Sequence, residues 1–93
     1  PVIACMGLAF KPDIDDLRES PALYVTESLE KENFKILAVE PNLNLNTERN
    51  LETISEAIRK ADIIVFLVAH SNFKDISLDP SKQVLDFCGV LNS

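Results

Sequence analysis

Apolar residues gather along this chain in short unbroken runs that polar segments separate. The first run, Val2–Leu8, is β-branched at its start and is followed by turn residues, which predicts a β-strand. Similar runs predict further strands at Phe34–Val39, Ile63–Val68 and Lys82–Phe87. Continuous rather than alternating hydrophobicity is typical of strands that are covered on both faces, as in a parallel sheet.

Between these runs, apolar residues recur at helical spacing. Ser20 and Pro21 predict a helix start, with Ser20 as the N-cap and Pro21 at the first helical position. A second helix is expected to begin after an N-cap at Thr53 or Ser55. The expected buried positions are Ala22, Val25 and Leu29 in the first helix and Ile54, Ala57, Ile58 and Ala61 in the second.

The order β-α-β-α-β-(α)-β predicts an α/β fold, a three-layer Rossmann-like domain. We expect a mostly parallel sheet of about four strands with helices on both faces, formed as one domain by residues 1–93. Ligands of such sheets bind beyond the carboxyl ends of the strands. Three predicted loops share that edge: residues 9–19, 40–44 and 69–73.

Composition narrows the function classes. The net charge of −6, from 15 acids and 9 bases, disfavours a nucleic-acid partner, and the apolar runs are too short for a membrane span. Cys5 and Cys88 have no metal-ligand spacing and are expected to be reduced thiols of a cytoplasmic protein. The chain opens on Pro1 without an initiator Met and with no visible signal peptide, so we expect a piece of a longer protein.

The segment after the first strand holds the densest candidate chemistry. Lys11 could contact a phosphate or carboxylate, or be a solvated lysine; Phe10 could pack on a ligand or fill the edge of the core. Arg18 could bind a phosphate through both guanidinium nitrogens, or pair with a neighbouring acid. Asp13, Asp15 and Asp16 could suggest Mg²⁺ or Ca²⁺, but acids on a turn are more often solvated, and no metal is expected.

Other signals for a cofactor or for catalysis are weak in the sequence itself. Gly7 and Gly89 are the only glycines, too few for a glycine-rich dinucleotide loop. Glu40 ends the second strand where dinucleotide folds place a ribose-binding acid, but without that loop the analogy carries little weight. His70 follows the third strand and is expected to be a structural hydrogen-bonding residue rather than an acid–base group.

The motif Gly7-Leu8-Ala9-Phe10-Lys11-Pro12, with Asp15-Asp16 and Arg18-Glu19-Ser20-Pro21-Ala22, resembles the start of the C-terminal, UDP-binding domain of the UDP-glucose/GDP-mannose dehydrogenase family. Within the family it is most similar to members that oxidise UDP-N-acetyl-D-mannosamine. Softer matches are Val39-Glu40-Pro41-Asn42, Ala61-Asp62-Ile63-Ile64-Val65 and the stretch from Val68 to Lys74.

This resemblance implies part of an NAD-dependent enzyme that oxidises the sugar C6 hydroxyl of a nucleotide sugar to a carboxylate through a cysteine-bound intermediate. Phe10 and Lys11 match residues that contact the UDP-sugar, and Arg18 matches an arginine that reaches NAD. The catalytic cysteine, the NAD loop and the remaining domains are expected elsewhere in a homodimeric enzyme. The fragment alone is therefore expected to be inactive, with no catalytic residue of its own.

One position departs from the family pattern, and alternatives stay open. Cys88 stands where the family often has a basic residue that touches substrate. The substrate could instead be UDP-N-acetylglucosamine, UDP-glucose or GDP-mannose. A receiver-like signalling module and a domain that packs but binds nothing are the other hypotheses.

Overall fold

The computed structural model describes residues 1–8, 20–41, 51–74 and 76–90. Its elements follow the predicted order. They are β1 (Val2–Met6), α1 (Pro21–Lys31), β2 (Lys35–Val39), α2 (Ile54–Lys60), β3 (Ile63–Phe66), the 3₁₀ turn η1 (Ser71–Phe73) and β4 (Gln83–Asp86).

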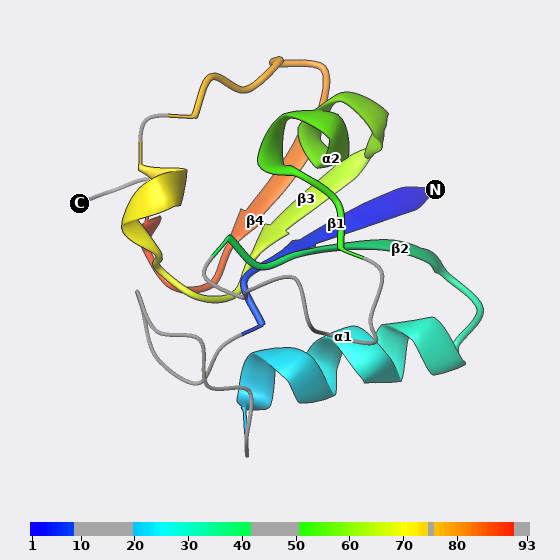
Figure 1. Ribbon diagram of the computed structural model, residues 1–93. Helices are drawn as coiled ribbons and strands as arrows, with labels where there is room; N and C mark the ends of the chain where they lie inside the picture. Colours follow the sequence, from blue (N-terminus) through cyan, green and yellow to red (C-terminus); the bar gives the residue numbers. More distant parts are fainter. Residues whose placement is uncertain (9–19, 42–50, 75, 91–93) are drawn as a thin grey trace.

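The four strands form one parallel sheet in the order β2-β1-β3-β4 (Figure 1). The central strand β1 pairs with β2 through Met6 and Val39, and with β3 through Met6 and Phe66. The carboxyl ends of the three strands therefore lie at the same edge of the sheet. This is the edge at which the sequence predicted a site.

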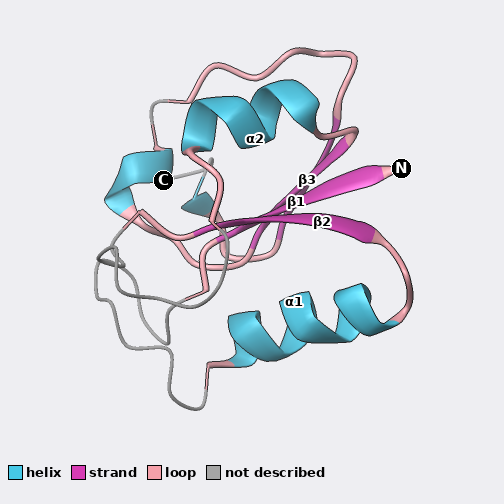
Figure 2. Ribbon diagram, turned by 45° about the vertical axis from the view of Figure 1, so that its right-hand side comes forward, coloured by secondary structure: helices cyan, strands magenta, loops and turns pink. Residues whose placement is uncertain are grey.

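The two helices cover opposite faces of the sheet (Figure 2), which confirms the predicted three-layer α/β fold. On the α2 face, sheet residues such as Met6 and Phe66 pack with Ala57 and Ala61 of the helix and its C-cap. On the α1 face a smaller cluster is formed by Ile3, Cys5 and Val65, with Leu29 packed against it. Alternate residues of β1 thus enter different cores, as the pleat of a strand requires.

The strands are shorter than the apolar runs that predicted them. The first was expected to reach Leu8, but β1 ends at Met6, because Gly7 has a φ of 102° and leaves the extended conformation. The third was expected to reach Val68, but β3 ends at Phe66. Leu8 and Val68 are nevertheless buried, at 0% and 6% exposure, so hydrophobicity continues past the strand pairing.

The first helix corrects one predicted core position. Val25 was expected on the buried face, but it is 38% exposed, while Thr26 is fully buried. The Thr26 hydroxyl donates to the carbonyl oxygen of Ala22 at 2.9 Å, which satisfies its polar group inside the core. In the second helix the predicted stripe is confirmed, and Thr53 rather than Ser55 is the N-cap.

Candidate functional site at the carboxyl edge of the sheet

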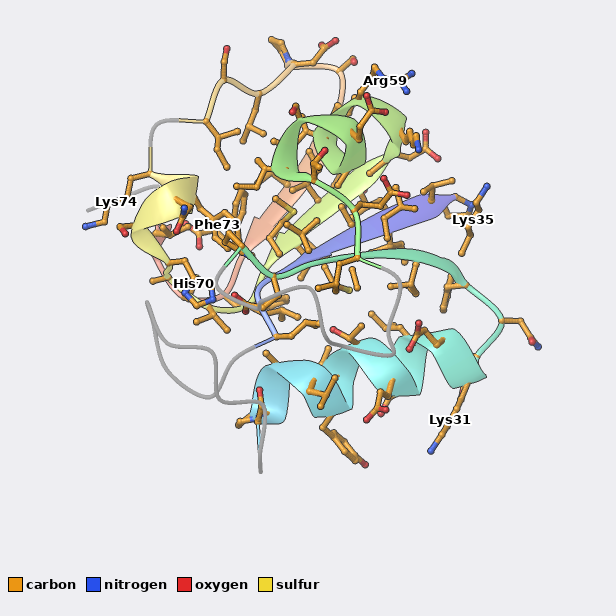
Figure 3. The ribbon with its side chains drawn as sticks, viewed as in Figure 1. Lys31, Lys35, Arg59, His70, Phe73 and Lys74 are labelled. Atoms are coloured by element: carbon orange, nitrogen blue, oxygen red, sulfur yellow. The ribbon has the colours of Figure 1, made fainter. Side chains whose placement is uncertain are left out.

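A buried carboxylate joins the ends of the three adjoining strands. Glu40 follows β2, and its Oε1 accepts a hydrogen bond from the Leu8 N–H at 2.8 Å. The same oxygen lies 2.8 Å from Nε2 of His70, which comes from the segment after β3. The side chains of Glu40 and His70 are both 0% exposed. Figure 3 shows His70 at the end of the sheet opposite Lys35, which begins β2.

One oxygen of Glu40 takes part in both contacts. A backbone N–H can only donate, so Oε1 of Glu40 accepts from Leu8. The contact between Oε1 and His70 Nε2 is a second hydrogen bond, whose donor depends on the tautomer of the ring. A buried carboxylate needs such donors, because the loss of water would otherwise cost several kcal/mol. Oε1 of Glu40 is thus hydrogen-bonded to two groups inside the protein.

The His70 ring also packs against an aromatic side chain. Phe73 of η1 lies with its ring centroid 5.5 Å from that of His70, at an interplanar angle of 60°. Phe73 also makes an edge contact with Phe66 at the end of β3, with centroids 5.6 Å apart. The predicted hydrogen bonding of His70 is confirmed. Its carboxylate partner, 30 residues away, was not predicted from the sequence.

Ser20 holds Leu8 from a second direction. Its hydroxyl donates to the carbonyl oxygen of Leu8 at 2.6 Å and accepts from the Leu23 N–H at 3.2 Å. The second contact confirms Ser20 as the N-cap of α1. Leu8 and Ser20 flank residues 9–19, so the two residues on either side of that segment are hydrogen-bonded to each other.

The approach of β1 to the chain after β3 requires a glycine. A Cβ atom on Gly7 would lie 2.7 Å from Cβ of Val68, closer than side-chain atoms approach one another. The positive φ of Gly7 adds a second reason, since other residues rarely adopt it. Gly7 therefore forms the turn that places the Leu8 N–H within hydrogen-bonding distance of Glu40.

The predicted ligand-contacting residues, Phe10, Lys11 and Arg18, lie outside the described residues. The neighbouring acids, for which no metal was expected, lie there as well: Asp13, Asp15, Asp16 and Glu19. What the structure places is the pair of residues that flank them, Leu8 and Ser20. The roles of Phe10, Lys11 and Arg18 stay predictions.

Asp86 ends β4 at the same edge and organises the chain that follows. Its Oδ1 accepts from the Val90 N–H at 3.1 Å and lies 3.6 Å from Sγ of Cys88. Burial raises the pKa of the Cys88 thiol, and the hydrogen bond to Asp86 and its charge act in the same direction. Cys88 is therefore a protonated thiol at neutral pH, unlike an activated nucleophile.

Among the described residues, no group of three His, Cys, Asp or Glu side chains is arranged to hold a metal ion. No helix among these residues has the length and apolar character needed to cross a bilayer.

The parallel sheet, its two covering helices and the polar edge define an α/β domain of the doubly wound class. The sequence model described as "UDP-glucose/GDP-mannose dehydrogenase family, UDP binding domain" matches residues 4–93. The chain therefore belongs to the UDP-glucose/GDP-mannose dehydrogenase family and corresponds to its UDP binding domain.

Curated relatives agree with this assignment. The chain is 48% identical to UDP-N-acetyl-D-mannosamine dehydrogenase of Campylobacter jejuni and 45% identical to that of Escherichia coli K12, each over 95% of its length. It is 38% identical, over 97% of its length, to NDP-N-acetyl-D-galactosaminuronic acid dehydrogenase of Ralstonia nicotianae. In each case the chain spans 23% of the relative's length.

A solved structure gives the same result. The native UDP-N-acetyl-mannosamine dehydrogenase Cap5O from Staphylococcus aureus superimposes with a TM-score of 0.81 at 32% sequence identity. A derivative structure of that protein gives 0.82. The match covers 99% of this chain and 23% of the Cap5O chain, so the described fold is that of one part of a larger dehydrogenase.

Proposed function

We propose that this chain is the C-terminal, UDP-sugar-binding domain of an NAD-dependent nucleotide-sugar 6-dehydrogenase. We further propose that the complete enzyme oxidises UDP-N-acetyl-D-mannosamine to UDP-N-acetyl-D-mannosaminuronate. The names and identities of the relatives support this substrate over UDP-N-acetylglucosamine or UDP-glucose. A cytoplasmic, homodimeric enzyme is part of the same proposal.

The observation that carries the proposal is the anchoring of Leu8 and Ser20. The motif that resembles the family signature runs through residues 7–22, and the structure ties its two described ends together at the carboxyl edge of a parallel sheet. Ligands of such folds bind at that edge. In the proposed complex, Phe10 and Lys11 contact the UDP-sugar, and Arg18 reaches NAD.

The described residues do not fit the pyrophosphate of NAD. A dinucleotide loop uses several glycines so that backbone N–H groups can approach phosphate closely. This chain has two, and the space a side chain would occupy at Gly7 is filled by Val68. We therefore place most of the NAD site in another domain of the same polypeptide.

The same division applies to the catalytic cysteine. Cys5 is fully buried in the sheet, and Cys88 is a thiol whose pKa is raised, so neither side chain suits covalent catalysis. In this proposal the chain binds the substrate and supplies a surface that covers the active site. By itself it does not oxidise the sugar.

The test is substitution of Lys11 by Ala in the complete dehydrogenase. Loss of a charge-assisted contact to a phosphate is expected to raise the KM for UDP-N-acetyl-D-mannosamine by about 10- to 100-fold. Lys31→Ala, at the far end of α1, is the matched control and should leave the KM unchanged (Figure 3). An unchanged KM in Lys11→Ala would instead favour a domain that packs against its neighbours and binds nothing.

A further inference from the structure

We propose that Glu40 and His70 are positioning residues for UDP binding, because they fix the Leu8 amide and thereby the place where the Phe10–Lys11 segment leaves the sheet. The inference rests on the proposed function and extends it to two residues that need not touch the ligand. Glu40 and His70 form a buried ionisable pair next to Leu8, the last described residue before that segment.

The first step is the rigidity of the Glu40 backbone. Glu40 directly follows β2, whose last residue Val39 pairs with Met6 of β1. The Gly7 N–H then donates to the Val39 carbonyl oxygen at 2.8 Å, one step beyond the strands. The Glu40 carboxylate therefore extends from a backbone that is hydrogen-bonded to the chain of β1. It accepts from Leu8, two residues beyond the end of that strand.

The second step is the fixation of the carboxylate itself. Oε1 of Glu40 would have rotational freedom if Leu8 were its sole partner through that atom, but His70 Nε2 approaches the same oxygen at 2.8 Å. His70 is in turn held by the η1 turn, where the Phe73 N–H donates to the His70 carbonyl oxygen at 3.0 Å. The ends of β1, β2 and β3 are thus linked through one oxygen atom.

Leu8 is close in sequence to the proposed ligand contacts. Lys11 is three residues beyond Leu8, a span of at most about 10–11 Å in a fully extended chain. A binding group must be held to within about 0.5 Å of its productive position. Release of Leu8 from Glu40 removes one of the two side-chain contacts that fix this starting point, so we expect weaker UDP binding.

The decisive measurement is the dissociation constant for UDP, by calorimetry, on the complete dehydrogenase. Glu40→Leu removes the acceptor for Leu8 and is expected to weaken UDP binding about tenfold or more, whereas Glu40→Gln retains an acceptor oxygen and should recover most of that loss. His70→Leu leaves the Leu8 contact but removes the second hydrogen bond of Oε1, so a smaller loss of about three- to tenfold is expected. His70→Leu decides the question if Glu40→Leu does not fold.

Two controls separate positioning from general stability. Glu56→Leu removes an exposed carboxylate on α2 and should leave UDP binding unchanged. Lys82 lies at the opposite edge of the sheet and donates to two main-chain carbonyl oxygens. Lys82→Met should lower the melting temperature, again without changing the UDP dissociation constant. If folded Glu40→Leu and His70→Leu proteins lose thermal stability but bind UDP like the wild type, the pair is structural only and the inference is wrong.

The result also distinguishes this inference from the proposed function. Absence of UDP binding by the wild-type enzyme would overturn the proposed function itself. In another outcome, the wild-type enzyme binds UDP, Lys11→Ala weakens this binding and Glu40→Leu does not. That outcome would support the proposed function and reject only the positioning role of Glu40.

Discussion

Leu8 has both of its main-chain groups bonded to side chains rather than to a neighbouring strand. Glu40 accepts from its N–H, and the Ser20 hydroxyl donates to its carbonyl oxygen. A buried residue just past the end of a strand would otherwise leave two polar groups without partners, each at a cost of about 1–3 kcal/mol. Single side chains thus complete the hydrogen bonding where the sheet stops.

Replacing Gly7 by Ala should destabilise the protein by roughly 2–4 kcal/mol, because strain at a positive φ adds to the clash with Val68. Gly89→Ala is a matched control, since Gly89 also has a positive φ, of 73°, but no atom lies within 4 Å of the added Cβ. Its expected cost is about 1 kcal/mol. Urea unfolding of both variants measures the difference, and equal losses would contradict the close approach at Val68.

Cys88 should react slowly with iodoacetamide at pH 7, because its raised pKa leaves little thiolate. The rate is expected to increase as the pH rises above the usual range for cysteine. Asp86→Asn removes the nearby negative charge, retains an acceptor for the Val90 N–H, and should accelerate the reaction. Peptide mapping by mass spectrometry follows the modification, and alkylation of wild-type Cys88 at the rate of the unfolded chain would refute the assignment.

At the scale of elements, apolar runs predicted the number, order and type of the strands, but not their ends. Hydrophobic burial continues to Leu8 and Val68, whereas strand pairing stops where the backbone of Gly7 turns. Helical periodicity likewise favoured Val25 over Thr26, because it does not account for a hydroxyl that bonds to its own helix. Backbone conformation and local hydrogen bonds decide these positions.

Lys82 joins two elements that are distant in sequence. Its ammonium donates to the carbonyl oxygens of Arg59 and Ala61 at 2.9 and 2.7 Å, at the C-terminal end of α2. Lys82→Met should therefore destabilise the fold by about 1–3 kcal/mol. Lys60→Met, which breaks only exposed ion pairs with Glu52 and Glu56, should cost about 0.5 kcal/mol or less in the same thermal unfolding assay. Equal costs would show that these carbonyl contacts contribute little.

At the scale of the whole molecule, the sequence predicted the fold and the family, and it predicted the edge at which polar residues gather. The meeting of Glu40 and His70 could not be predicted in detail, since each side chain could equally have faced solvent after its strand. The sheet order β2-β1-β3 places the ends of β2 and β3 on either side of β1, and Phe73 of η1 packs against the imidazole. Together they bring His70 Nε2 within hydrogen-bonding distance of Glu40 Oε1. Phe10, Lys11 and Arg18 stay predictions that rest on the motif.

The hydrogen bond between Ser20 and Leu8 bears on how such a domain could diversify. A segment that replaced residues 9–19 would begin after Leu8 and end before Ser20, whatever its sequence, so it would start and finish at the same hydrogen bond. Doubling the length of a flexible loop costs only about 0.6 kcal/mol in closure entropy. The sequence between Leu8 and Ser20 could therefore differ among relatives while the sheet and helices stay the same. Changes in this stretch alone could then alter which ligand the domain binds.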